Sequence, residues 1–230
     1  MAKTSYIPPL RFRVLTPAYD LIVRWTSGEL AFRAAIVDAL KRSEFANLVD
    51  LGCGTGSLVA ILSAAFPQAQ ITGIDADRAA LDIARMKLGA IRADVRLLHG
   101  DARCLPLPDG TIGAVTSSLF FHHLDDPAKR LVLQEVHRCL APDGVFVVAD
   151  WDRAGSFPRR FAFNVVRMLD GLAVTRSHAT GRFGDLLADA GFSIGEQVPV
   201  PALLGQVTIW TCRKTNNPGA AVNAVRPAKP

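Results

Sequence analysis

The chain has 230 residues, of which 50% are hydrophobic and 20% are charged. This composition is typical of a globular protein and excludes global disorder, and the length suits one α/β domain with local additions. The net charge of +5 is spread along the chain without long basic runs, which argues against a nucleic-acid partner.

The N-terminal part of the chain is predicted to form an arm followed by helices. Residues 1–15 hold two adjacent prolines and scattered basic residues, which indicates an extended arm. Apolar residues recur at helical spacing over residues 17–25 and 29–42. We therefore expect residues 1–42 to form an arm and a helical segment ahead of the first strand.

From residue 43 onward, short apolar runs alternate with helical stretches. Strands are predicted for NLVDLG, QITGID, VRLLHGD, IGAVTSS and GVFVVAD, and helices near residues 57–65, 77–88 and 127–140. This order is typical of βαβ units in a doubly wound, mostly parallel sheet with helices on both faces. The strand runs do not alternate polar and apolar residues, as expected when both faces of a sheet are covered.

After Trp151 the pattern changes. A further helix is predicted over about residues 157–174, and a short helix that ends at Gly191 follows it. The runs SIGEQVPV and LLGQVTIWTCRK have no helix between them, so an antiparallel hairpin is expected to complete a seven-stranded sheet. We place the main domain at residues 43–213 and a disordered tail at residues 214–230, where apolar periodicity is lost.

The stretch LVDLGCGTGS combines a strand that ends in an acid with a glycine-rich turn. Gly52, Gly54 and Gly56 follow Asp50 at the predicted carboxyl edge of the sheet and precede a helix. Glycine adopts positive φ and has no Cβ, so a bulky cofactor can approach the backbone here. The spacing is GxGxG, because the dinucleotide pattern GxGxxG requires a glycine where Ser57 stands. An acid before the loop repels a pyrophosphate, so Asp50 favours a cationic ligand.

Four motifs follow one another over residues 45–150: VDLGCGTG, GIDAD, GDARCLPLPDGTIGAVTSSLFFHHL and LAPDGVFVVAD. In these motifs the chain resembles the class I S-adenosylmethionine-dependent methyltransferases. It is most similar to the small-molecule group (methyltransferase type 11) that includes the ubiquinone and menaquinone methyltransferases. The resemblance implies a Rossmann-like fold, S-adenosylmethionine as cofactor and S-adenosylhomocysteine as product. It also implies that the N-terminal helices form a lid over the cofactor.

Acids after the second and third strands are expected to hold this cofactor. Asp75 closes GIDAD, where a carboxylate can accept both ribose hydroxyls. Asp77 is interpreted as the cap of the next helix. The resemblance implies that Asp101 contacts the adenine amino group and that the backbone N–H of Ala102 meets the ring. A turn-forming aspartate after glycine is the alternative for Asp101.

The resemblance also implies that SSLFFHHL, residues 117–124, runs beneath the methionine part of the cofactor. Ser118, Leu119 and Phe120 are the positions predicted nearest to it. The [DN]PP[YF] tetrapeptide of amino-group methyltransferases that act on DNA bases or glutamine is missing here, which disfavours those substrates. Tyr19 of the lid is expected to cover the sulfonium and exclude water, with an ordinary core tyrosine as the alternative.

Methyl transfer from a sulfonium is an in-line displacement, so alignment of the reacting atoms supplies most of the catalysis. An oxygen or carbon nucleophile also benefits from a base, and His122 is the candidate; the alternative is that HHL merely starts a loop. Phe120, His122 and Phe161 are expected to line the substrate pocket. The insert helix at residues 157–174 is expected to roof this pocket, with peripheral contact to an anionic membrane as the alternative.

The four cysteines lie far apart and form no CxxC pair, which predicts neither a metal site nor a disulfide framework. The N-terminus lacks a signal-like apolar segment, so a cytoplasmic protein is expected. The sequence thus predicts S-adenosylmethionine-dependent methyl transfer to oxygen or carbon of a small-molecule substrate. A quinone C-methyltransferase, a phospholipid-headgroup N-methyltransferase and a non-catalytic cofactor-binding protein are the alternatives, and the oligomeric state is left open.

Overall fold

The computed structural model describes residues 29–91, 93–155, 159, 163–164, 167, 171–172, 174–203 and 205–215. The predicted helix at residues 17–25, most of the insert at residues 157–174 and the tail from residue 216 lie outside this set. Tyr19 and Phe161 also lie outside it. The lid and the pocket roof therefore stay predictions.

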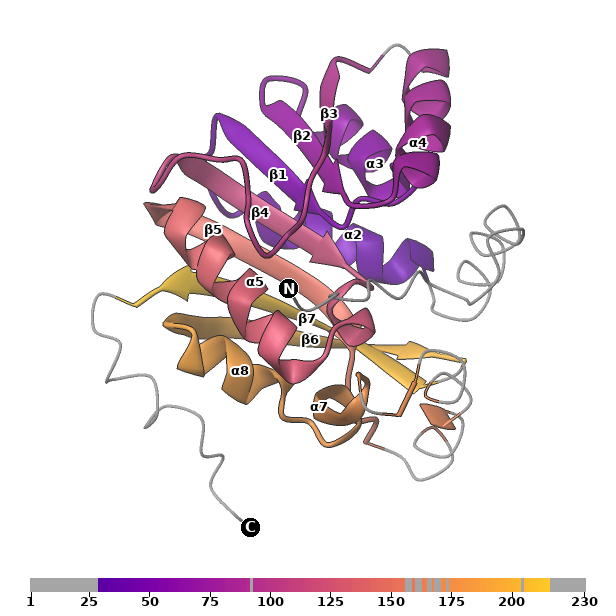
Figure 1. Ribbon diagram of the computed structural model, residues 1–230, viewed down its shortest axis with the longest axis vertical. Coiled ribbons are helices and arrows are strands. Elements are labelled where there is room, and N and C mark those ends of the chain that lie inside the picture. Colours follow the sequence, from indigo (N-terminus) through magenta and orange to yellow (C-terminus); the bar gives the residue numbers. More distant parts are fainter. Residues whose placement is uncertain are drawn as a thin grey trace, which may run out of the picture.

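Seven strands form one mixed sheet in the order β3-β2-β1-β4-β5-β7-β6 (Figure 1). The first five strands pair in parallel, and β7 runs antiparallel to both β5 and β6. This confirms the predicted mostly parallel sheet with an antiparallel C-terminal hairpin. The strands are β1 (Asn47–Leu51), β2 (Gln70–Asp75), β3 (Val95–His99), β4 (Ile112–Ser118), β5 (Leu140–Trp151), β6 (Phe192–Ala202) and β7 (Gly205–Lys214).

Helices cover both faces of the sheet (Figure 1). Helices α2, α3 and α4 share one buried cluster with the sheet, and α5 and α8 share the other. Strand β5 is accordingly buried at every position from Gly144 to Trp151, which explains why its sequence does not alternate. The helices are α2 (Glu29–Leu40), α3 (Ser57–Ala65), α4 (Arg78–Ala90), α5 (Asp126–Cys139), α7 (Arg176–Ala179) and α8 (Phe183–Asp189), with the 3₁₀ turn η1 (Phe121–His123).

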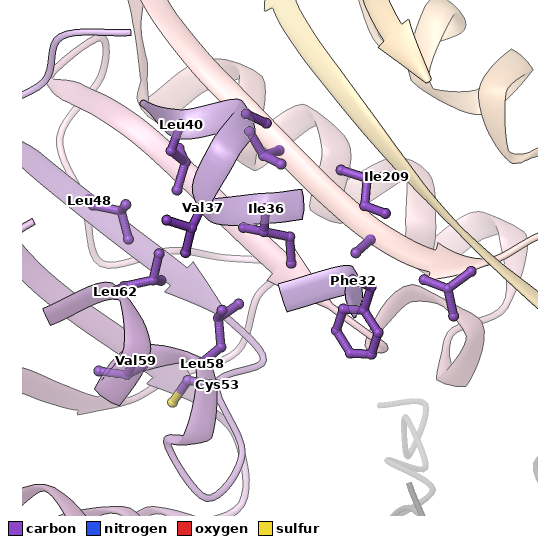
Figure 2. Close-up of a cluster of buried hydrophobic side chains, with 14 of the residues drawn as sticks. Phe32, Ile36, Val37, Leu40, Leu48, Cys53, Leu58, Val59, Leu62 and Ile209 are labelled. Carbon is purple, nitrogen blue, oxygen red and sulfur yellow. The ribbon is translucent and has the colours of Figure 1, made fainter. Parts of the chain in front are cut away.

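Helix α2 packs its apolar side chains against the sheet. Phe32, Ile36 and Leu40 recur every four residues, which places them on one helix face, and each is at most 1% exposed. Figure 2 shows this face beside Leu48 of β1 and Ile209 of β7. Full burial of one such side chain contributes about 1.5–3 kcal/mol. Part of the segment predicted as arm and lid therefore belongs to the core of the domain.

Strand β5 begins earlier than predicted. The strand is predicted to start at Gly144 with GVFVVAD, whereas pairing starts at Leu140, which faces Ile112 of β4. The register between the two strands shifts just after Ile112. This irregularity accommodates the proline and the glycine within the strand, because β5 has more residues than β4 between the pairs Ile112–Leu140 and Ala114–Val145, and the additional residues are left unpaired.

Polar residues and glycines end the helices as the sequence predicts. The Asp77 carboxylate accepts the N–H of Ala79 at 2.9 Å at the start of α4, which confirms its interpretation as a cap. Gly191 follows the last turn of α8 with a φ of 88°, a conformation that favours glycine. Asp77, which caps α4, lies two residues after Asp75, the predicted site residue at the carboxyl end of β2.

Gly56 and Gly89 form a matched pair for a stability test. Gly56 caps α3 with a φ of 75°, and a Cβ there would lie 3.0 Å from the Cβ of Ala84. At Gly89, inside α4, a Cβ would meet no described heavy atom within 4 Å. We expect Gly56→Ala to lower the free energy of unfolding by about 2 kcal/mol, because left-handed strain adds to the close contact. Gly89→Ala should raise it by up to about 1 kcal/mol.

Urea unfolding followed by circular dichroism measures both changes on the cofactor-free protein. Two substitutions with the same sign would contradict the assignment of Gly56 to a strained turn.

Candidate active site

The three glycines of the turn between β1 and α3 have different surroundings. The three glycines have φ values of 70°, 53° and 75°, all in the left-handed region. A Cβ at Gly52 would lie 2.5 Å from the ring of Phe120, and one at Gly56 would meet Ala84. At Gly54 no described heavy atom would lie within 4 Å. The turn therefore has space for a ligand at Gly54, whereas side chains of the protein itself pack against Gly52 and Gly56.

Asp75, at the carboxyl end of β2, is tied to this turn. One carboxylate oxygen accepts the N–H of Gly54 at 2.7 Å, and the other accepts the N–H of Asp77 at 2.8 Å. Burial raises the pKa of Asp75, and these N–H donors oppose the rise. Each carboxylate oxygen keeps further acceptor capacity. The predicted ribose ligand thus lies directly beside the open face of the turn.

Asp50 is the next-to-last residue of β1 and is only 1% exposed. Its carboxylate accepts a hydrogen bond from the Thr116 hydroxyl of β4 at 2.8 Å. Burial raises the pKa of Asp50 to about 7, while the Thr116 hydrogen bond and the positive charge of Arg33 lower it. A cation of the chain itself therefore acts on this carboxylate, and the predicted contact with a cationic ligand stays a prediction.

Asp101 follows β3 at the same edge of the sheet, where Arg103 shares its carboxylate. The Arg103 backbone N–H donates to it at 2.9 Å and the guanidinium at 2.6 Å. The hydrogen bond with Arg103 holds the pKa of Asp101 below its usual range. The turn proposed as the alternative is therefore present. Contacts of Asp101 and Ala102 with adenine stay predictions, compatible with this turn because the carboxylate is half exposed.

The chain changes direction immediately after Ser118, the last residue of β4. Leu119 has a φ of 50°, the single positive value among non-glycine residues in the described ranges. Its N–H donates to the carbonyl of Ala149 at 2.8 Å. A left-handed leucine costs roughly 1–2 kcal/mol, and such strain gathers at functional sites. The next residue, Phe120, lies against Gly52, so the segment predicted to border the methionine group does reach the glycine turn.

His122 lies in η1, two residues after Phe120. Its Nδ1 is 2.7 Å from Oδ1 of Asp150 at the carboxyl end of β5, and its backbone N–H donates to Oδ2 at 3.3 Å. Both side chains are buried. Although burial opposes it, the neighbouring histidines hold the pKa of Asp150 well below its usual range. The sequence does not predict Asp150, although it lies near the carboxyl end of a strand just as Asp50 and Asp75 do.

Two further buried groups adjoin this pair. His178 of α7 is fully buried, and its Nδ1 is 2.7 Å from the carbonyl oxygen of Trp151. Burial lowers the pKa of His178 to about 4. Lys129 of α5 donates to the Val174 carbonyl at 2.6 Å and to the Ser177 hydroxyl at 2.9 Å. The sequence alone indicates no role for either residue, since an isolated histidine or lysine forms no pattern.

Two structural features are missing from the described ranges. No group of three or more His, Cys, Asp or Glu residues in them is placed to hold a metal ion. No helix in them combines the length and the apolar character that crossing a membrane requires. Neither finding bears on the remaining residues.

Known proteins share the segment that carries this site. Residues 48–144 match a family model described as a methyltransferase domain. The demethylmenaquinone methyltransferase of Thermus thermophilus is 36% identical over 157 residues, which cover 67% of this chain and 69% of that protein. The ubiquinone/menaquinone biosynthesis C-methyltransferase of Methylobacterium nodulans is 26% identical over 206 residues, covering 79% and 81%.

A solved structure agrees with these relatives. A SAM-dependent methyltransferase from Aquifex aeolicus superposes with a TM-score of 0.58 at 21% identity, over 76% of this chain and 87% of that one. This likeness shows the fold, and the identity with the Thermus protein shows the family, whose cofactor is S-adenosylmethionine. The chain therefore belongs to the class I S-adenosylmethionine-dependent methyltransferases, in the small-molecule group that contains the demethylmenaquinone methyltransferases.

Proposed function

We propose that this protein transfers a methyl group from S-adenosylmethionine to an oxygen or carbon atom of a small organic acceptor. The observation that carries the proposal is the hydrogen bond between the Gly54 N–H and the Asp75 carboxylate beside an open space. Gly54 leaves open space that a Cβ would fill, and its N–H is bound by a carboxylate with capacity for ribose hydroxyls. These residues fit an adenosyl cofactor.

Residues at neighbouring strand ends would share the binding. Asp75 would accept the ribose hydroxyls, and Asp101 with the backbone N–H of Ala102 would contact the adenine. Ser118 and the segment after it would border the methionine part. The carboxyl ends of parallel strands meet at one edge of the sheet, so one extended ligand can contact all of these residues.

When bound, the cofactor supplies an electrophilic methyl group on a sulfonium. A bond would form between this carbon and the acceptor oxygen or carbon, and the carbon–sulfur bond would break with its electron pair left on sulfur. The chain holds the acceptor in line and excludes water. His122 would take the acceptor proton at Nε2, because its Nδ1 faces the Asp150 carboxylate.

A quinone-ring carbon is the second candidate for the acceptor atom. The Thermus relative is named a demethylmenaquinone methyltransferase, which favours this chemistry. A buried histidine beside a carboxylate suits either a hydroxyl or a ring carbon conjugated to one, since both release a proton. No observation in the described part of the chain specifically favours an amine of a phospholipid headgroup.

The ribose assignment is tested with Asp75→Ala. We expect the dissociation constant for S-adenosylhomocysteine to rise at least about tenfold, because a hydrogen bond to a charged group contributes about 1.5–3 kcal/mol. Isothermal titration calorimetry measures the change. Asp82→Ala is the matched control, since Asp82 lies exposed on α4 and pairs with Arg85. Equal affinities for the two variants would contradict the assignment.

Asp50 predicts a pH dependence of stability. The pKa of Asp50 is about 7 in the folded protein and about 3.8 when unfolded, so the unfolded state loses this proton first. The resulting stability is complete below about pH 4 and is lost as pH rises through about 7. Asparagine does not titrate, so the free energy of unfolding of Asp50→Asn relative to that of wild type should increase by up to about 4 kcal/mol as pH rises from about 4 to about 7. Urea unfolding across pH measures it, and parallel profiles would refute the shift.

Turnover separates an enzyme from a non-catalytic binding protein. We expect wild type to transfer a radiolabelled methyl group to a phenol or a quinol, and His122→Ala to reduce the rate about 10²- to 10⁴-fold. Phosphatidylethanolamine liposomes test the headgroup alternative in the same assay. Intact S-adenosylhomocysteine binding without any transfer by wild type would favour the non-catalytic protein.

A further inference from the structure

The end of β5 holds two imidazole rings through consecutive residues. The Asp150 carboxylate binds Nδ1 of His122, and the Trp151 carbonyl binds Nδ1 of His178, each at 2.7 Å. The centroids of the two rings are 6.3 Å apart, and their planes are nearly perpendicular at 87°. Histidines from η1 and α7 thus meet at the carboxyl edge of the sheet.

Both contacts fix which ring nitrogen carries the proton. A backbone carbonyl can only accept, so neutral His178 carries its proton on Nδ1. The Asp150 carboxylate also accepts the backbone N–H of Trp151 at 2.7 Å, which keeps it an ionised acceptor, and His122 therefore donates from Nδ1 as well. In both neutral rings Nε2 bears the lone pair.

The Nε2 atom of His178 is buried, and none of the described residues offers it a hydrogen bond. An unsatisfied buried polar atom costs about 1–3 kcal/mol, and such atoms are rare in folded proteins. A donor that arrives with a ligand would remove this cost. The orphaned atom therefore points to a polar hydrogen on the substrate.

The surroundings give the two rings different chemistry. Burial lowers the pKa of His178 to about 4, and the cation of Lys129 opposes the favourable charge of Asp150 there, so the ring stays neutral at pH 7. His122 is bonded directly to the carboxylate, which stabilises the imidazolium that forms when it takes a proton. His123 is a further titratable group close to His122, with its ring centroid 4.0 Å away.

His122 follows closely after a residue that contacts the glycine turn. Phe120 contacts Gly52 of that turn, and His122 follows Phe120 by two residues. Asp150 lies on β5, the strand beside β4. Asp150 and His122 therefore lie near the end of β4, after which the methyl group is predicted to bind. A substrate that reaches the methyl group thus approaches this edge.

We propose that Asp150 and Trp151 present two acceptor nitrogens to one substrate: His122 Nε2 takes the proton of the reacting group, and His178 Nε2 accepts a hydrogen bond from a second donor of the same molecule. Asp150 is then a positioning residue and His178 a specificity-determining residue. The inference rests on the proposed function and adds that the acceptor carries two hydrogen-bond donors on one frame.

Calorimetry on protein saturated with S-adenosylhomocysteine tests the second acceptor without turnover. The anaerobic probes are 1,4-naphthalenediol and 4-methoxy-1-naphthol, which share a ring system but carry two donors and one. We expect wild type to bind the diol about tenfold more tightly, the factor that corresponds to one hydrogen bond. His178→Asn should lose this preference, because the asparagine amide can still donate to the Trp151 carbonyl but lacks the distal lone pair. His137→Asn, on α5 against Phe192, should keep it.

Steady-state kinetics with the diol test the positioning role. Asp150→Asn should lower kcat about 100-fold with little change in KM, since the acceptor nitrogens remain while the charge is lost. The rising limb of its pH–rate profile should move to lower pH, because a neutral amide no longer stabilises protonated His122. If Asp150 had a merely structural role, its substitution would leave the rising limb of the pH–rate profile at the same pH.

The outcomes separate the two proposals. Failure of wild type to bind S-adenosylhomocysteine would overturn the proposed function. Binding of S-adenosylhomocysteine but of neither probe, or equal binding of both probes by wild type, would overturn the two-acceptor site alone. An unchanged kcat and pH profile in Asp150→Asn would remove the positioning role.

Discussion

The hydrogen bond from the Gly54 amide to the Asp75 carboxylate is the constraint on which the site depends. It joins the turn after β1 to the end of β2, and the N–H groups of Gly52 and Cys53 add two bonds to the Ile74 carbonyl, at 2.8 and 3.1 Å. Neighbouring parallel strands thus shape the turn before any ligand arrives. Such preorganisation reduces the ordering that binding would otherwise require.

Local chemistry made most of the fold predictable. Glycines and prolines mark the element boundaries, and the bounds predicted for α3, β2 and β4 agree with the structure. The prediction failed at the start of β5, because Pro142 and Gly144 occupy an irregular stretch of strand instead of a turn. Pairing with β4 decides that outcome, and one strand's sequence does not contain it. The place of α2 in the core depends on tertiary packing in the same way.

The site could be predicted only where a role follows from position along one strand or helix. The helix cap Asp77 is of this kind, and so is the position of Asp75 at a strand end beside the glycine turn, while its contact with a ribose stays a prediction. Asp150 and His178 were missed because their partners come from distant segments, and the burial of Asp50 was equally invisible. A hydrogen-bond partner 28 residues away leaves no local pattern, so these buried contacts emerge only from the assembled sheet.

The two aromatic residues that follow Leu119 pack against different parts of the molecule. Because its backbone adopts the left-handed conformation, Phe120 turns onto the glycine loop while Phe121 is fully buried against Phe146 and Phe183. Sequence drift at these neighbouring positions is therefore under unequal pressure. Natural variation or laboratory evolution can therefore alter the surroundings of the glycine turn through residue 120, whereas substitution of residue 121 would disturb the core.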